Sequence, residues 1–191
     1  MTQLVYAPGN YYHLYNRGRS RLSICHDQRD YLDILDKLKA YSRKYHIIPI
    51  AYTLLPNHYH ILGRQDDLPR ASLLTQRIFN SYGKTYNLKY QHSGTIFEGP
   101  VKVKPVTNQR YLLHLCRYIH ANPVLHGITR TLDDWPYTNY HEWIGTRSGN
   151  LVDHDFIRDH FPTADSYRQF VLDYLRDRRH PAGLDYLGEW S

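Results

Sequence analysis

Two histidines separated by one residue, His58 and His60, have the spacing best suited to chemistry. They stand in an apolar stretch, residues 54–62 (LLPNHYHIL), that is predicted to be extended. Alternate residues of a strand share a face, so the two imidazoles would lie side by side, about 7 Å apart at the backbone. Two imidazoles on one face can turn their nitrogens toward a single cation. Tyr59, between them, would point the other way into a core.

The histidine pair does not by itself make a metal site. In a chain with 13 histidines in 191 residues, about 0.9 such triplets are expected by chance, so the match is only a hypothesis. Two ordinary half-buried strand histidines are the plainer interpretation, because a metal site needs more than two ligands. A third ligand and a reactive group must come from another element.

A helix predicted over residues 109–122 offers further polar groups. Asn108 suits its N-cap, and Pro123 is predicted to end it. Tyr118 and Asn122 are four residues apart, so their side chains would be neighbours on one flank. The pattern alone does not say whether this flank faces the histidines.

The remaining hydrophobic patterns predict the elements that position these groups. Strands are predicted over residues 10–16, 47–55, 58–63 and 95–106, and helices over residues 26–46, 72–88, 109–122 and 166–178. Pro49 and Pro56 argue that the second strand is interrupted or at an edge. The order β-α-β-β-α-β-α, followed by a helical tail, predicts an α+β fold whose mainly antiparallel sheet has helices packed on one face.

Composition limits the class of protein. The length fits one well-cored domain, and no apolar run approaches the ~18 residues of a membrane span. The first residues do not resemble a secretory signal. Cys25 and Cys116 lie far apart and are predicted to be buried free thiols in a reducing compartment.

Charge and aromatic content favour a nucleic-acid partner. The net charge is +6 and the pI is about 9.2, which suits an acidic partner. The 19 tyrosines, against 5 phenylalanines and 3 tryptophans, could stack on unpaired bases. For most of them, replacement of phenylalanine in the core is the plainer interpretation.

Basic side chains gather at three places where they could bind phosphates. These are the loop residues Arg17, Arg19 and Arg21, the strand residues Lys102 and Lys104, and the helix residues Arg110 and Arg117. Phosphate contacts position a nucleic acid without reading its sequence. Solvated surface charge is an equally good explanation for the arginine loop and the lysine strand.

Five segments together resemble a known family. They are residues 12–18 (YHLYNRG), 55–60 (LPNHYH), 94–99 (GTIFEG), 117–124 (RYIHANPV) and 135–140 (WPYTNY). Each is weak alone, but in this order they resemble the single-tyrosine HUH transposases and, more narrowly, the REP-associated tyrosine transposases. The resemblance covers about residues 10–143.

The resemblance implies a role for each group of the histidine and helix motifs. His58 and His60 would be metal ligands, Tyr118 the nucleophile and Asn122 a third ligand. The insertion-sequence branch is expected to have glutamine where this chain has Asn122, whose shorter side chain puts its reach in doubt. The implied cofactor is Mg²⁺ or Mn²⁺, with Zn²⁺ as an alternative in a purified sample. The implied fold is ferredoxin-like.

The resemblance also implies a substrate, which is single-stranded DNA folded into a REP-type hairpin. Tyr118 would form a 5′-phosphotyrosine intermediate during cleavage and strand transfer. The seven basic residues named above, with Asn16 beside them, are the candidate DNA contacts. A bacterial cytoplasmic protein, a monomer or a homodimer that associates with the nucleoid and not with a membrane, is expected. Residues 1–148 are predicted to form the transposase domain and residues 149–191 a helical extension packed on it.

Two other functions fit the same sequence. One is a domesticated hairpin-binding protein with little catalysis, whose binding would not need His58 or His60. The other is a structural or RNA-binding module on a ferredoxin-like fold, which would show no cation dependence and would prefer RNA.

Overall fold

The computed structural model describes residues 5–68, 70–179 and 186–187. Four strands form one sheet in the order β2-β3-β1-β4, and every neighbouring pair is antiparallel. The strands are β1 (Tyr11–Arg17), β2 (Ile47–Leu54), β3 (His58–Gln65) and β4 (Lys102–Pro105). Helix α1 (Gln28–Lys44) joins β1 to β2, and α2 (Ser72–Lys89) joins β3 to β4. This is a ferredoxin-like topology, so the predicted fold class is confirmed.

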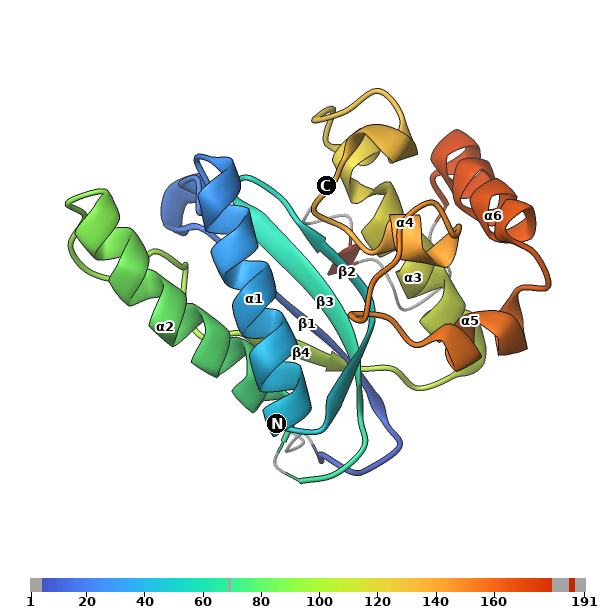
Figure 1. The fold of residues 1–191 in the computed structure, drawn as a ribbon, viewed down its shortest axis with the longest axis horizontal. Helices are drawn as coiled ribbons and strands as arrows, with labels where there is room; N and C mark the ends of the chain where they lie inside the picture. The colour runs from blue at the N-terminus through green and yellow to red at the C-terminus, as the bar shows by residue number, and fades with distance from the viewer. Residues whose placement is uncertain (1–4, 69, 180–185, 188–191) are drawn as a thin grey trace.

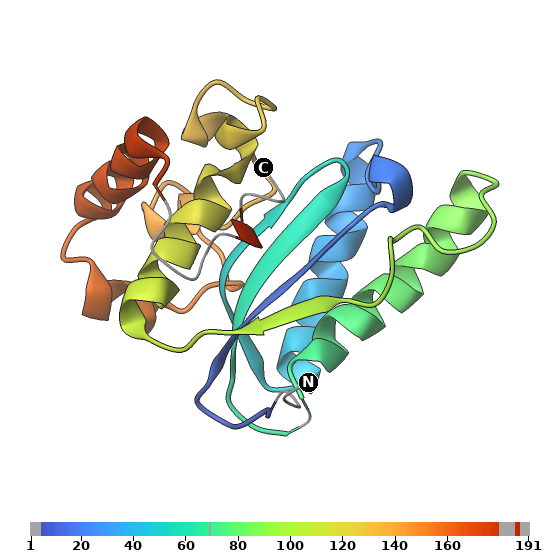
Figure 2. The ribbon, with the colours of Figure 1, turned by 180° about the vertical axis from the view of Figure 1, so that it is seen from behind.

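Helices cover both faces of this sheet. Helices α1 and α2 lie on one face, as predicted, whereas the helices that follow β4 lie on the other (Figure 1, Figure 2). These are α3 (Gln109–Leu125), α4 (Tyr140–Trp143), α5 (His154–His160) and α6 (Ala164–Asp177), with short 3₁₀ turns at Arg19–Arg21 and Leu132–Asp134. The sequence-based description had helices on one face only.

The second helical layer has a physical cause in the middle strands. Ile61 and Leu62 are consecutive in β3, so they point to opposite faces, and both are fully buried. Ile61 belongs to the core under α1 and α2, whereas Leu62 belongs to the core under α3 and α6. A strand that is apolar on both faces must be covered on both.

Local sequence signals fix several boundaries. Asp27 caps α1 in a capping box with Asp30. Strand β2 is an edge strand whose register shifts between Pro49 and Ala51, as expected of a strand that contains proline. The hairpin between β2 and β3 places His58 at the first position of β3.

Two predicted boundaries are wrong. Only Lys102–Pro105 of the strand predicted over 95–106 form β4, because Gly99 and Pro100 interrupt the extended segment. Helix α3 does not end before Pro123 but continues to Leu125. A helix can pass through proline when the unpaired carbonyl and the ring are accommodated locally.

The described residues 5–68, 70–179 and 186–187 contain no helix that combines the length and apolarity needed to span a membrane. Cys25 and Cys116 are buried free thiols. Helix α6 packs on α3 in the second core, although a domain boundary at residue 148 stays a prediction.

Candidate cation and tyrosine site

His58 and His60 project from β3 into the layer that contains α3. They are 4% and 0% exposed, and their ring centroids are 5.3 Å apart with the rings nearly perpendicular. Tyr59, between them, stacks on Phe79 in the opposite core with ring centroids 4.0 Å apart. The alternation expected of the strand therefore places the imidazole pair on one face.

Helix α3 brings Tyr118 and Asn122 to these imidazoles. The ring centroids of Tyr118 and His60 are 5.5 Å apart in an edge-to-face arrangement. The Asn122 amide nitrogen donates to the Tyr118 carbonyl at 2.8 Å. Burial lowers the pKa of His58, and the neighbouring Asn122 side chain offsets part of that lowering. The strand pair and the helix pair, about sixty residues apart in the sequence, meet in one buried cluster.

Both imidazoles are held through their Nδ1 atoms. His58 Nδ1 lies 2.7 Å from Asn57 Oδ1, and His60 Nδ1 lies 2.9 Å from His13 Nε2. A hydrogen bond at one ring nitrogen sets the tautomer and leaves the other nitrogen for a ligand. Within the described part of the chain, His58 Nε2 and Asn122 Oδ1 are buried without a hydrogen-bond partner.

The buried surroundings keep the imidazoles neutral. Burial, and then the neighbouring His126, lower the pKa of His58 to about 3. Burial, and then His13, lower the pKa of His60 well below its ordinary value. The neutral imidazole is the form that binds metal ions.

His126 also lies in this cluster and was missed by sequence reasoning. Its ring centroid is 4.6 Å from that of His58, and its Nε2 is buried without a hydrogen-bond partner among the described residues. It is the C-cap residue of α3, four residues after Asn122. The signal was hidden because Pro123 predicted an earlier end to the helix.

The donor set suits a divalent cation only if Asn122 takes part. Among the residues described, no group of three or more His, Cys, Asp or Glu side chains is placed to hold a metal ion. Imidazole nitrogens with an amide oxygen are ligands that Mn²⁺ accepts, and Mg²⁺ accepts such oxygens. The orphaned Nε2 of His58 and Oδ1 of Asn122 fit such a group.

A C-terminal pair of residues covers the phenol. Tyr118 is 0% exposed, and its hydroxyl donates to the Leu187 carbonyl at 3.1 Å. The preceding Tyr186 hydroxyl lies 3.1 Å from His13 Nδ1 and 2.5 Å from the Tyr111 hydroxyl. In this conformation Tyr118 faces the imidazoles but is closed to a large substrate.

Two of the predicted basic residues, Arg17 and Arg21, lie near the histidine cluster. Arg17 is the cross-strand partner of His58, forms a 2.7 Å ion pair with Glu98, and contributes to the lowered pKa of His58. Arg19 and Arg21 are exposed, and Arg21 contributes to the lowered pKa of His126. The arginine loop therefore borders the cluster.

The lysines of β4 lie on the same side of the sheet. Lys102 pairs with Tyr15 and Lys104 with His13, and Tyr15 in turn pairs with His60. Directly paired residues share a face, so both lysines stand on the histidine face. They are exposed, which suits phosphate contacts next to the cluster.

The other predicted DNA contacts are placed differently. Arg110 is exposed near the start of α3, but the Arg117 guanidinium is packed 4.4 Å from the Phe170 ring centroid on α6. Asn16 is 3% exposed, and it donates to the Gly99 carbonyl and accepts from the Arg17 backbone. Arg117 and Asn16 thus hold the fold together, and a DNA contact for either stays a prediction.

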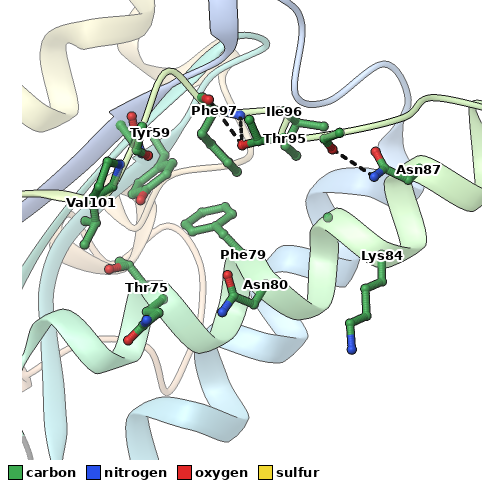
Figure 3. Close-up of a pocket in the computed structure, with 16 residues that line it drawn as sticks. Tyr59, Thr75, Phe79, Asn80, Lys84, Asn87, Thr95, Ile96, Phe97 and Val101 are labelled. Atoms are coloured by element: carbon green, nitrogen blue, oxygen red, sulfur yellow. Dashed lines mark hydrogen bonds between the residues drawn. The ribbon is translucent and has the colours of Figure 1, made fainter.

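Asn16 also lines a cavity of about 510 Å³ on the far side of the sheet. The cavity lies between α2 and residues 94–101, with Phe79 and Phe97 in its wall (Figure 3). Since Asn16 pairs with Tyr59 rather than with a histidine, the cavity is separated from the imidazole cluster by the sheet.

Fold and cluster together define a ferredoxin-like protein with two strand histidines facing a helical tyrosine and asparagine. Comparison with known proteins finds one relative in sequence. A Haemophilus influenzae protein named as a candidate REP-associated tyrosine transposase is 31% identical over an alignment of 107 residues. The match covers 48% of this chain and 58% of that protein. The match thus spans less than two thirds of that relative. No family profile matches the chain.

A solved structure is also similar. The structure of a REP-associated tyrosine transposase bound to a REP hairpin aligns with a TM-score of 0.60 and 19% identity, covering 80% of this chain and 93% of that one. At this identity the likeness shows the fold. The resemblance to REP-associated tyrosine transposases that the sequence motifs indicate is confirmed by the Haemophilus relative.

Proposed function

We propose that this chain is a cation-dependent single-strand DNA endonuclease and strand transferase acting at REP-type hairpins through Tyr118. The observation that carries the proposal is the meeting of four side chains: the ring of Tyr118 lies 5.5 Å from that of His60, while Asn122 lies beside His58. The sequence relative and the fold neighbour support the substrate class, since both are described as REP-associated tyrosine transposases.

The reaction is a transesterification at a phosphodiester. The Tyr118 phenolic oxygen bonds to phosphorus as the bond from phosphorus to the 3′ oxygen breaks, giving a 5′-phosphotyrosine and a free 3′-hydroxyl. The phenol loses its proton and the 3′ oxygen gains one, so charge is balanced. Because the phosphotyrosine keeps the energy of the phosphodiester, another 3′-hydroxyl can reverse the step and join strands.

The residues around Tyr118 prepare this step. A phenol with an ordinary pKa near 10 is a weak nucleophile at neutral pH. His58, His60 and Asn122 would hold a Mg²⁺ or Mn²⁺ ion, which supplies positive charge to the scissile phosphate when bound. Arg17, Arg19, Arg21, Lys102 and Lys104 border the same face and would hold neighbouring phosphates.

The direct test uses the whole chain with a single-stranded REP-type hairpin carrying a 3′ fluorescent label and Mn²⁺. The expected product is a labelled band that migrates with the protein on a denaturing gel and disappears after protease digestion. Chelation by EDTA should prevent its formation. A hairpin that is bound but never becomes covalently attached would contradict the proposal.

Removal of residues 186–191 is expected to speed cleavage. The phenol must leave the Leu187 carbonyl before it can reach a phosphate, and Tyr186 also hydrogen-bonds to His13 and Tyr111. Hydrogen bonds worth about 1 kcal/mol each would favour the closed form over the open form by roughly 10- to 100-fold. Single-turnover cleavage rates of the shortened and whole chains measure this release.

The matched control is a chain that lacks only residues 188–191 and keeps both contacting residues. The difference between the rates of the two shortened chains is then due to Tyr186 and Leu187. If both shortened chains cleave no faster than the whole chain, the contact to Tyr118 does not limit the reaction.

A hairpin-binding protein with little catalysis is the second candidate. The closed position of Tyr118 favours it, because a fully buried nucleophile is not ready to react. In that case hairpin binding would be unaffected by EDTA and no covalent product would form. An RNA-binding module, in contrast, would prefer the RNA version of the same hairpin.

A further inference from the structure

A line of hydrogen bonds runs from His60 away from the cation site. His60 Nδ1 is 2.9 Å from His13 Nε2, and His13 Nδ1 is 3.1 Å from the Tyr186 hydroxyl. That hydroxyl is 2.5 Å from the Tyr111 hydroxyl. His13 and His60 are both 0% exposed and their rings are stacked, with centroids 5.1 Å apart. No sequence motif assigned His13 a role.

The contact between the two imidazoles permits two proton arrangements. A neutral imidazole, which is the form that binds a cation, carries one N–H. Either His60 Nδ1 donates to His13 Nε2, or His13 Nε2 donates to His60 Nδ1. In the second arrangement His60 carries its proton on Nε2, and that nitrogen cannot bind a cation.

We propose that His13 is a positioning residue that fixes His60 in the Nδ1-protonated form, which makes Nε2 the ligand atom; the proposal rests on the cation-dependent function above. His13 would then accept at Nε2 and donate from Nδ1 to the Tyr186 hydroxyl, which donates to Tyr111. Both directions give every bond one donor and one acceptor, but only this one leaves His60 Nε2 without a proton and able to bind a cation. Asn57 Oδ1, which can only accept, does the same for His58.

Strand geometry explains why His13 occupies this place. Tyr15 is the direct cross-strand partner of His60, and His13 precedes it by two residues on the same face. His13 is therefore the diagonal neighbour of His60, within reach of a long ring. Partners of this kind orient ligand imidazoles, and their loss typically weakens metal affinity by 10- to 100-fold.

The test compares Mn²⁺ affinity of the whole chain, measured by electron paramagnetic resonance of the free ion. His13→Phe keeps the ring volume but cannot accept, and it is expected to weaken affinity by roughly 10- to 100-fold. His13→Gln can place an amide oxygen near the original Nε2. If a hydrogen-bond acceptor at this position is what His60 needs, the Mn²⁺ affinity of this variant should fall by less than about fivefold. His120→Phe is the matched control, because His120 is equally buried and bonds Tyr167 and Asn139 instead.

A second readout does not depend on the variants folding. Long-range ¹H–¹⁵N spectra of the whole wild-type chain with Zn²⁺ should show His60 protonated at Nδ1 and coordinated at Nε2. Coordination at Nδ1, or His13→Phe affinity equal to that of the wild type, would overturn the role of His13. If the wild type itself binds no Mn²⁺, the proposed cation-dependent function fails first, and the two failures are thereby distinguished.

Discussion

Replacing Tyr118 with phenylalanine is expected to abolish covalent attachment to the hairpin and to lower the cleavage rate by roughly 1,000-fold or more, as for other nucleophile deletions. Phenylalanine keeps the ring that packs 5.5 Å from His60 but lacks the oxygen that bonds to phosphorus. The change removes the hydrogen bond to the Leu187 carbonyl, which costs about 1 kcal/mol. Hairpin affinity should therefore stay within about fivefold of the wild type, since 1 kcal/mol corresponds to about fivefold and 1.4 kcal/mol to tenfold.

Tyr167→Phe is a suitable control for this loss. Tyr167 is also fully buried, and its hydroxyl bonds His120 rather than the C-terminal pair. Both variants lose a buried hydroxyl and its hydrogen bond, but only Tyr118→Phe loses the proposed nucleophile. Cleavage that survives in Tyr118→Phe, or fails equally in Tyr167→Phe, would remove Tyr118 from its role.

Replacing His58 with alanine is expected to lower Mn²⁺-dependent cleavage by roughly 100- to 10,000-fold, because a ligand of the charge-stabilising ion is lost. His58 is 4% exposed and holds a hydrogen bond to Asn57, so its imidazole cannot be replaced by a neighbour without rearrangement. Cleavage at several Mn²⁺ concentrations, with hairpin affinity measured in parallel, separates loss of the ion from loss of DNA binding. Partial recovery of cleavage at high Mn²⁺ is expected.

His120→Ala controls for the removal of a buried histidine from this layer. His120 lies on α3 but bonds Tyr167 and Asn139, so its loss should lower the free energy of unfolding without changing the Mn²⁺ dependence. Thermal unfolding of both variants shows whether the comparison is between folded proteins. Equal cleavage by wild type and His58→Ala would exclude a cation held at this site.

Local patterns in the sequence determined how each element is built. Alternation placed His58 and His60 on one face and Tyr59 on the other, because side chains of a strand alternate. The four-residue spacing placed Asn122 beside Tyr118, because a helix repeats every 3.6 residues. Asp27, Pro49 and the hairpin before His58 were readable for the same reason, since caps, prolines and turns act on their immediate neighbours.

Only the tertiary structure decided which elements face one another. Helix α3 lies over the histidine face because Leu62 and its neighbours need a second apolar layer, and spacing within a segment does not specify that packing. His126 enters the cluster because α3 continues past Pro123. His13 lies beside His60 because of the register between β1 and β3. Leu187 contacts Tyr118 because this C-terminal residue packs against α3. These contacts join residues far apart in the sequence, so their distances depend on how the layers pack and not on local periodicity.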